Sequence, residues 1–176
     1  MTLDWPRILD LLAQHVQLSF AALGLALVIA LPLAIWSVRS RTVAGVTLGF
    51  ASLVQTIPAL ALLALFFPLL LALSAIFGDV ISPLGFLPSL LALTLYALLP
   101  ILRNAVTGLR SVEPAMVEAA DGVGMTPLQK LWLVEAPLAS PTIMAGVRTA
   151  AVWTIGAATL STTVGQPSRG DLIFAG

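Results

Sequence analysis

Four stretches of this 176-residue chain contain no aspartate, glutamate, lysine or arginine. They cover residues 16–38, 42–78, 80–102 and 149–168. About 20 consecutive apolar residues cross a lipid bilayer as a helix, so each stretch is long enough to span one. Charged residues make up only 9% of the chain, well below the roughly 25% of soluble domains. The sequence therefore predicts an all-α, multi-pass integral membrane protein.

The second of these stretches, residues 42–78, is too long for one straight crossing. As an uninterrupted helix it would measure about 55 Å, whereas the hydrocarbon core of a bilayer is about 30 Å thick. Proline interrupts helices, and this stretch contains Pro58 and Pro68. It forms either one long, tilted crossing broken at these prolines or two short crossings.

Four arginines favour the single crossing. Arg39 and Arg41 follow the first charge-free stretch, and Arg103 and Arg110 follow the third. Short loops rich in lysine and arginine face the cytoplasm, so an even number of crossings must separate the two pairs. One crossing through the second stretch and one through the third meet this condition. The expected spans are approximately 16–38, 43–72, 86–109 and 141–161.

This topology places the N-terminus outside, a short outer loop around Asp79, and residues 111–137 in the cytoplasm. The sequence stops on the outer side, directly after an apolar LIFA run that resembles the beginning of another span. We therefore expect that a final C-terminal span is missing from this sequence. Residues 1–176 are expected to form a single transmembrane domain.

Residues 111–137, called the connecting segment below, contain the start and stop signals of short helices. Pro114 suits the first turn of a helix, where its missing N–H has no partner to lose. Gly122 and Gly124 suit the end of that helix, because glycine readily adopts the left-handed conformation of a C-cap. The sequence therefore predicts one short helix that ends in a glycine turn.

A second short helix is expected to follow the turn. Thr126 is a suitable N-cap, Pro127 suits the first helical position, and Gln129 lies at the spacing of a capping box. Pro137 is expected to end this helix, and Ser140–Pro141 to begin the fourth span in the same way. One face of the second helix is expected to carry Leu128, Leu131 and Trp132.

The connecting segment lacks the residues that catalysis or metal binding needs. Its acids have no histidine or cysteine near them, because the chain has no cysteine and its only histidine, His15, belongs to the opposite side of the membrane. Lys130, the only lysine, does not belong to the G-x-x-x-x-G-K-[ST] sequence that holds nucleotide phosphates. We expect no catalytic residue, no metal and no bound cofactor in this chain. From the residues alone, the segment is either a docking surface for another protein or a solvated connection between spans.

A spaced motif favours docking. Glu118-Ala119-Ala120, three residues, Gly124, nine residues and then Val134-x-Ala136-Pro137 resemble the EAA motif of the membrane permease subunits of binding-protein-dependent ABC importers. Ala136 stands where that motif has leucine. The resemblance implies that a short helix of the segment fits a groove on a separate ATPase subunit, which holds ATP and Mg. With the apolar face of the second helix included, the residues expected to dock and couple are Glu118, Ala119, Ala120, Gly124, Leu128, Leu131, Trp132 and Pro137.

Longer segments narrow the resemblance. SLVQTIPALALLAL, LYALLPILRNAVTGL, GVRTAAVWTIGAATL and STTVGQPSRG are similar to the permeases of importers that carry glycine betaine, choline, carnitine or related quaternary amines. This similarity implies a type I (MetI-like) importer permease fold in a bacterial or archaeal cytoplasmic membrane. The implied partners are ATPase subunits, an extracytoplasmic substrate-binding protein and a second permease, either a copy or a homologue. The net charge of zero gives no reason to expect nucleic acid.

Two other functions remain as alternatives. The first is a permease of the same type for an amino acid or an oxyanion. The second is a secondary transporter or channel subunit that needs no ATPase, which the sequence disfavours because its spans contain no carboxylates to couple ions and no inverted repeat.

A solute pathway needs polar or aromatic groups at membrane depth. Where a helix is broken within the bilayer, its freed backbone groups can line a cavity, and aromatic faces attract quaternary ammonium cations. Ordinary helix packing is the alternative role for such side chains. The candidate pathway residues are Gln55, Thr56, Pro58, Tyr96, Trp153, Thr154 and Ser161.

Overall fold

The computed structural model describes residues 5–77 and 82–165, and every secondary-structure element in this part of the chain is helical. The first four helices are α1 (Trp5–Arg39), α2 (Arg41–Thr56), α3 (Ala59–Phe77) and α4 (Phe86–Arg110). They are followed by α5 (Pro114–Gly122), α6 (Pro127–Lys130), the π-helical turn η1 (Leu131–Glu135), α7 (Ala136–Ala157) and the 3₁₀ turn η2 (Ala158–Val164). The all-α prediction is confirmed. The predicted loop around Asp79 and the apolar run after Asp171 lie outside the described residues.

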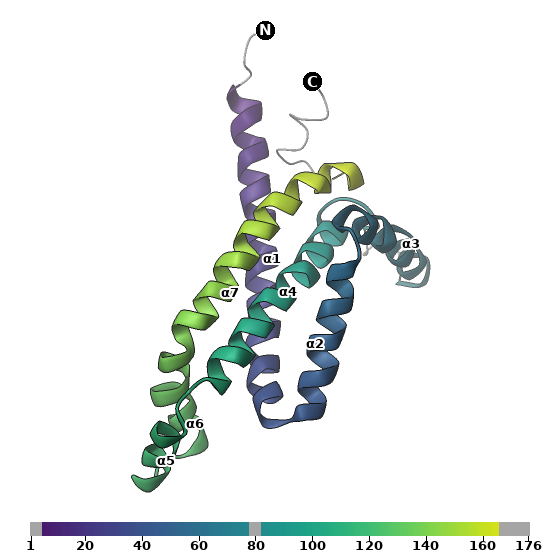
Figure 1. The fold of residues 1–176 in the computed structure, drawn as a ribbon. Helices are drawn as coiled ribbons and strands as arrows, with labels where there is room; N and C mark the ends of the chain where they lie inside the picture. The colour runs from purple at the N-terminus through teal and green to yellow at the C-terminus, as the bar shows by residue number, and fades with distance from the viewer. Residues whose placement is uncertain (1–4, 78–81, 166–176) are drawn as a thin grey trace.

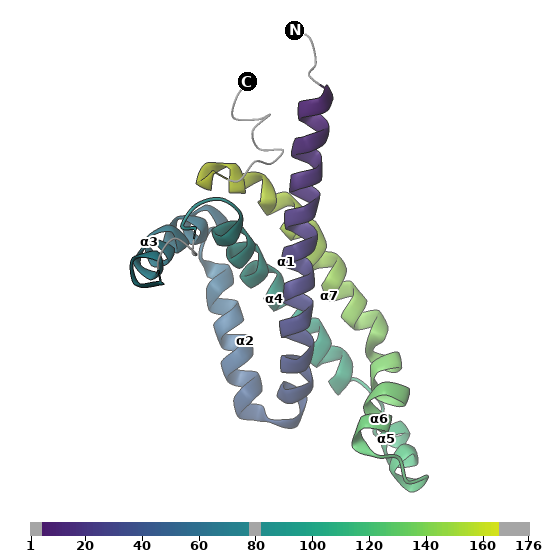
Figure 2. The same cartoon turned by 180° about the vertical axis from the view of Figure 1, so that it is seen from behind.

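Helix α4 is the centre of the bundle and packs against both α1 and α7 (Figures 1 and 2). Small side chains line the contacts. On α1 the row of Ala22, Ala26, Ala30 and Ala34, one residue per turn, is fully buried. Lipid tails are as apolar as the helices themselves, so close backbone approach through small residues supplies much of the packing energy in a membrane.

Large apolar side chains point outward from these helices. Phe20 and Val28 of α1, for example, are 66% and 71% exposed, as expected for a surface in contact with lipid. Within the described residues, four helical runs are long and apolar enough to cross a membrane. They are Trp5–Arg39, Ala59–Phe77, Phe86–Arg110 and Pro127–Thr163. The structure therefore agrees with the multi-pass prediction.

The expected break at Pro58 is present, but the one at Pro68 is not. Ile57 lies between α2 and α3 with extended dihedral angles (φ −81°, ψ 126°), because the residue before a proline is disfavoured in the helical region. Pro68 lies inside α3, which continues through it. Helix α2 returns beside α1, and α3 then turns to one side (Figure 1). A single crossing by this pair stays a prediction.

The predicted boundary at Pro137 is wrong. Helices α6, η1 and α7 form one uninterrupted helical run, with Pro137 in the first turn of α7 and Pro141 inside it. Proline removes an N–H and crowds the carbonyl four residues earlier. The π turn accommodates this, since it widens the helix so that the N–H of Ala136 bonds to the carbonyl of Leu131. The helical run that contains the fourth candidate span therefore begins at Pro127; the predicted crossing over about 141–161 within it stays a prediction.

Candidate functional site

The first half of the connecting segment is a nine-residue helix closed by a glycine cap. Helix α5 begins at Pro114 and ends at Gly122. Gly124 has a φ of +79°, its N–H bonds to the carbonyl of Asp121, and the N–H of Met125 bonds to the carbonyl of Ala120 at 3.1 Å. This pair of bonds is the Schellman motif, in which the left-handed position favours glycine. The predicted glycine turn is therefore confirmed.

The second half begins with the predicted capping box. The backbone N–H of Gln129 donates to the Thr126 hydroxyl, and the Gln129 side chain accepts from the N–H of Thr126 at 2.9 Å. Pro127 occupies the first helical position. An ion pair of 2.7 Å between Lys130 and Asp121 then joins α6 to α5 across the turn. The segment is thus a defined elbow held by local hydrogen bonds and one charge pair.

The elbow presents a small apolar depression. A depression of about 250 Å³ lies between α5, the turn and η1. Glu118 and Ala119 are exposed on α5, whereas Ala120 is buried. The lining residues are Met116, Ala119, Ala120, Val123, Met125 and Val134. Because alanine leaves the helix surface thin and Glu118 can accept charge-assisted hydrogen bonds, this face suits contact with another protein.

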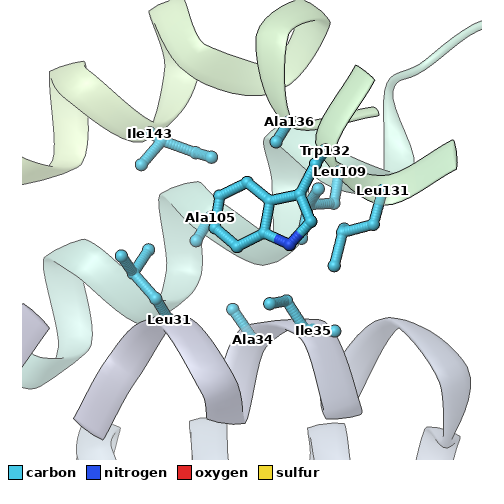
Figure 3. Close-up of a pocket in the computed structure, with 9 residues that line it drawn as sticks. All are labelled: Leu31, Ala34, Ile35, Ala105, Leu109, Leu131, Trp132, Ala136 and Ile143. Atoms are coloured by element: carbon cyan, nitrogen blue, oxygen red, sulfur yellow. The ribbon is translucent and has the colours of Figure 1, made fainter. Parts of the chain in front are cut away.

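The predicted face of Leu128, Leu131 and Trp132 does not form one exposed surface. Leu128 and Trp132 are 65% and 62% exposed, but Leu131 is only 6% exposed. Leu131 and Trp132 line an apolar cavity of about 120 Å³ between α1, α4 and α7, and Figure 3 shows the Trp132 indole within its ring of side chains. Leu131 lies on the side of the helical run that faces α1 and α4, whereas Leu128 lies outside this contact. The remaining lining residues are Leu31, Ala34, Ile35, Ala105, Leu109, Ala136 and Ile143.

Two of the predicted pathway residues meet at the break between α2 and α3. The Gln55 amide donates to the backbone carbonyl of Tyr96 at 3.1 Å, and the Tyr96 hydroxyl donates to the carbonyl of Ile57. The Tyr96 carbonyl lacks its helical partner because the residue four positions later is Pro100, which has no N–H. Gln55 thus supplies the donor that the α4 proline removed, and Tyr96 holds the broken backbone in return.

The other predicted pathway residues are distributed differently. The Thr56 hydroxyl bonds back to its own helix at the Leu53 carbonyl, and Pro58 is exposed at the break. Trp153 on α7 is 49% exposed. Thr154 and Ser161 are buried; Ser161 bonds to the Ala158 carbonyl, while the Thr154 hydroxyl has no partner among the described residues. Only Gln55 and Tyr96 are joined by a recorded hydrogen bond.

Sequence reasoning missed the close contact between α4 and α7. At Gly146 an added Cβ would lie 2.6 Å from both the Cβ of Asn104 and the carbonyl oxygen of Pro100. At Gly108 it would lie 3.0 Å from the carbonyl oxygen of Ala139. Glycine in a membrane helix is a general signal for such contacts, but the sequence does not say which of its glycines make them.

Known proteins resemble this chain over nearly its whole length. It is 41% identical over 163 residues to the choline transport system permease protein OpuBB of Bacillus subtilis, covering 93% of this chain and 70% of that protein. The glycine betaine/carnitine/choline transport system permease protein OpuCB of Bacillus subtilis gives the same identity and coverage. The osmoprotectant import permease protein OsmW of Salmonella typhimurium is also 41% identical, with 93% and 73% covered.

Solved structures share the fold. The methionine ABC transporter MetNI in an inward-facing conformation matches with a TM-score of 0.76 at 20% identity, over 96% of this chain and 78% of that one. An amino acid ABC transporter crystallised with histidines matches with a TM-score of 0.73 at 20% identity, over 99% and 84%. The predicted type I importer permease fold is thereby confirmed.

A family model matches most of the sequence. Residues 22–176 fit the family described as the binding-protein-dependent transport system inner membrane component. This match takes in all of the helices from α2 onward and the whole EAA-like motif. The chain therefore belongs to the family of inner-membrane components of binding-protein-dependent transport systems.

Proposed function

We propose that this chain is the membrane-spanning permease subunit of an ATP-driven importer for an osmoprotectant quaternary amine, of the glycine betaine, choline or carnitine type. The observation that carries the proposal is the 41% identity, over 93% of the chain, to permeases named for choline, for glycine betaine/carnitine/choline and for osmoprotectant import. The solved amino acid transporters are only 20% identical, so they support the fold and not an amino acid as substrate.

ATP and Mg are held by a separate ATPase subunit in this proposal. The connecting segment lies in the cytoplasm and docks on that subunit through α5, where Glu118 and Ala119 are exposed. The Schellman cap at Gly124 sets the direction in which the chain leaves α5. Leu128 is exposed beside the elbow and extends the contact, while Trp132 borders it and turns its indole toward the cavity between α1, α4 and α7. Leu131 takes part only indirectly, because it is buried against the bundle.

The membrane part completes the importer with a second permease, either a copy or a homologue, and an extracytoplasmic binding protein that delivers the solute. With the N-terminus outside, α2 rises from the cytoplasmic side over 16 residues, about 24 Å, so the break between α2 and α3 lies in the outer half of the bilayer. Gln55 and Tyr96 meet at this break, which supports a place on the solute pathway. The exposed indole of Trp153 offers an aromatic face to a quaternary ammonium group. Thr56, Pro58, Thr154 and Ser161 remain candidates for the same pathway.

The test is ATP-driven uptake by the full permease, reconstituted in liposomes with its ATPase and binding protein. Labelled choline is the probe, with glycine betaine, carnitine and methionine as competitors. We expect uptake only with ATP, and competition by the quaternary amines but not by methionine. Uptake that follows an ion gradient without ATP contradicts the importer, and competition by methionine alone contradicts the substrate.

A glycine pair tests the elbow itself. A Cβ at Gly122 or at Gly124 meets no atom within 4 Å, but only Gly124 has a left-handed φ. A left-handed L-residue costs about 1–2 kcal/mol. In Gly124→Val this cost should reduce the population of the observed elbow conformation roughly fivefold or more. Coupled uptake should fall by the same factor if it depends on that conformation. Gly122→Val, the matched control, should leave uptake within about twofold. If both variants insert normally and transport equally, the elbow does not couple.

A further inference from the structure

An open depression lies at the end of the bundle where α1 and α4 finish, apart from the elbow and the pathway candidates. It has a volume of about 590 Å³ and lies between α1, α2 and α4. Its lining combines two arginines with apolar side chains. The lining residues are Val38, Arg41, Ala44, Gly45, Leu48 and Arg110.

The two guanidinium groups have no carboxylate partner in the part of the chain that the structure describes, where the recorded ion pair is Lys130–Asp121. Arg110 uses one N–H to bond to the Ser37 carbonyl at 3.1 Å, one of the last four carbonyls of α1 that the helix itself leaves free. This bond holds Arg110 beside the depression, and its other N–H groups remain for a ligand. The depression therefore carries two positive charges, of which the one on Arg110 is held in place by α1.

Its position is that of a lipid headgroup. Arg41 is the first residue of α2, and Arg110 is the last residue of α4, so both lie where apolar helices leave the hydrocarbon. Trp36, on the last turns of α1, is 61% exposed, as is typical of the aromatic belt at the interface. On α2, Val46 and Phe50 point outward and are mostly exposed, so acyl chains border the same helix that lines the depression.

We propose that this depression binds one anionic phospholipid, with its phosphate between Arg41 and Arg110 and an acyl chain along Leu48 and Val38. Arginine suits phosphate because its planar fork donates two parallel hydrogen bonds. A net negative lipid complements two unpaired guanidinium groups better than a zwitterionic one. The glycerol lies over Gly45, where an added Cβ would meet no atom within 4 Å.

The chain provides matched controls for each part of the site. Arg41→Gln removes a lining charge, and Arg39→Gln removes an equal charge two residues away that does not line the depression. Gly45→Leu adds a side chain on the lining at a position where a Cβ meets no atom within 4 Å, and Gly49→Leu adds the same side chain one turn further along α2, where a Cβ also meets nothing within 4 Å.

The experiment counts retained lipid on the full chain, purified in mild detergent, by native mass spectrometry. Phosphatidylglycerol and phosphatidylcholine with identical acyl chains are titrated separately, and an excess of inorganic phosphate is added in a third arm. We expect one phosphatidylglycerol to be retained in preference to phosphatidylcholine. Arg41→Gln should weaken it roughly fivefold, the effect of one arginine near an anionic surface, and Gly45→Leu should weaken it also. Arg39→Gln and Gly49→Leu should change it less than twofold.

Four results would overturn the proposal. Equal retention of the two lipids would show that the site does not select for a negative headgroup. Equal weakening of lipid retention by Arg39→Gln and Arg41→Gln would show that general surface charge, and not the depression, retains the lipid. Displacement of the lipid by inorganic phosphate makes the depression a site for free anions. Unchanged lipid retention in Gly45→Leu, together with a loss of permease dimers, makes it an interface with a second copy.

Discussion

The contact between α4 and α7 makes a sharp prediction at Gly146. A Cβ there would lie 2.6 Å from the Cβ of Asn104 and from the carbonyl oxygen of Pro100, whereas ordinary contact begins at 3.4 Å. An alanine would therefore force the two helices apart locally by about 0.8 Å. Asn104 cannot turn away freely, because its side-chain amide donates to the same Pro100 carbonyl at 2.8 Å.

Two opposing effects set the size of the change. Alanine is favoured over glycine inside a helix by about 1 kcal/mol, which stabilises the variant. Overpacking costs about 1–3 kcal/mol, and a weakened bond between Asn104 and Pro100 adds about 1 kcal/mol. We therefore expect Gly146→Ala to lower the free energy of unfolding by about 1–3 kcal/mol. Gly156 on the same helix has no atom within 4 Å of an added Cβ, so Gly156→Ala should be neutral or stabilising.

The measurement is unfolding of the full chain in detergent micelles by added denaturing detergent, followed by far-UV circular dichroism. The expected order of midpoints is Gly146→Ala lowest, then Gly108→Ala, whose Cβ would approach Ala139 to 3.0 Å, then the unchanged chain and Gly156→Ala. A Gly146→Ala variant as stable as Gly156→Ala would refute the close-packing argument. Equal losses of stability in Gly146→Ala and Gly156→Ala would mean that these glycines provide flexibility instead of space.

Two further predictions concern hydrogen bonds. Gln55→Leu leaves the Tyr96 carbonyl unpartnered and should cost about 1–3 kcal/mol of stability; combined with Tyr96→Phe, the losses should be less than additive by at least about 0.5 kcal/mol, because both bonds hold one break. If the two losses of stability simply add in the same unfolding titration, the hydrogen bonds of Gln55 and Tyr96 act independently and the prediction is wrong. Thr126→Ala removes the N-cap and should cost the elbow about 1 kcal/mol, seen as roughly fivefold faster hydrogen exchange at Gln129 and Lys130. Unchanged exchange there would show that the capping box does not stabilise α6.

The elbow was the part most completely predicted from sequence, because its geometry depends on neighbours within a few residues. The left-handed glycine at 124, the proline at the start of α5 and the capping box at Thr126 all appear where the pattern indicated. Caps obey local hydrogen-bonding rules, so no knowledge of the rest of the fold was needed. The four membrane runs were likewise evident from length and lack of charge.

The prolines were the part least predictable from sequence. Pro58 coincides with a break, but Pro68, Pro100 and Pro141 lie inside continuous helices. What matters is whether the carbonyl four residues earlier finds another donor or enough room. For Pro100 that donor is Gln55, 41 residues from Tyr96 in the sequence. A helix pattern contains no information about so distant a partner.

Pro137 shows how this difference bears on the proposed coupling. A helix ended by this proline would have left the elbow joined to the fourth span by a flexible connection. Instead the π turn carries the helix through it, so a force applied at α6 reaches α7 along one helical run. That run contacts α4 at Gly146 and Gly108, where the two helices are too close for an added Cβ. Its π turn also contributes Leu131 and Trp132 to the apolar cavity between α1, α4 and α7. This continuous helical path therefore leads from the elbow into the contact with α4 at the centre of the bundle.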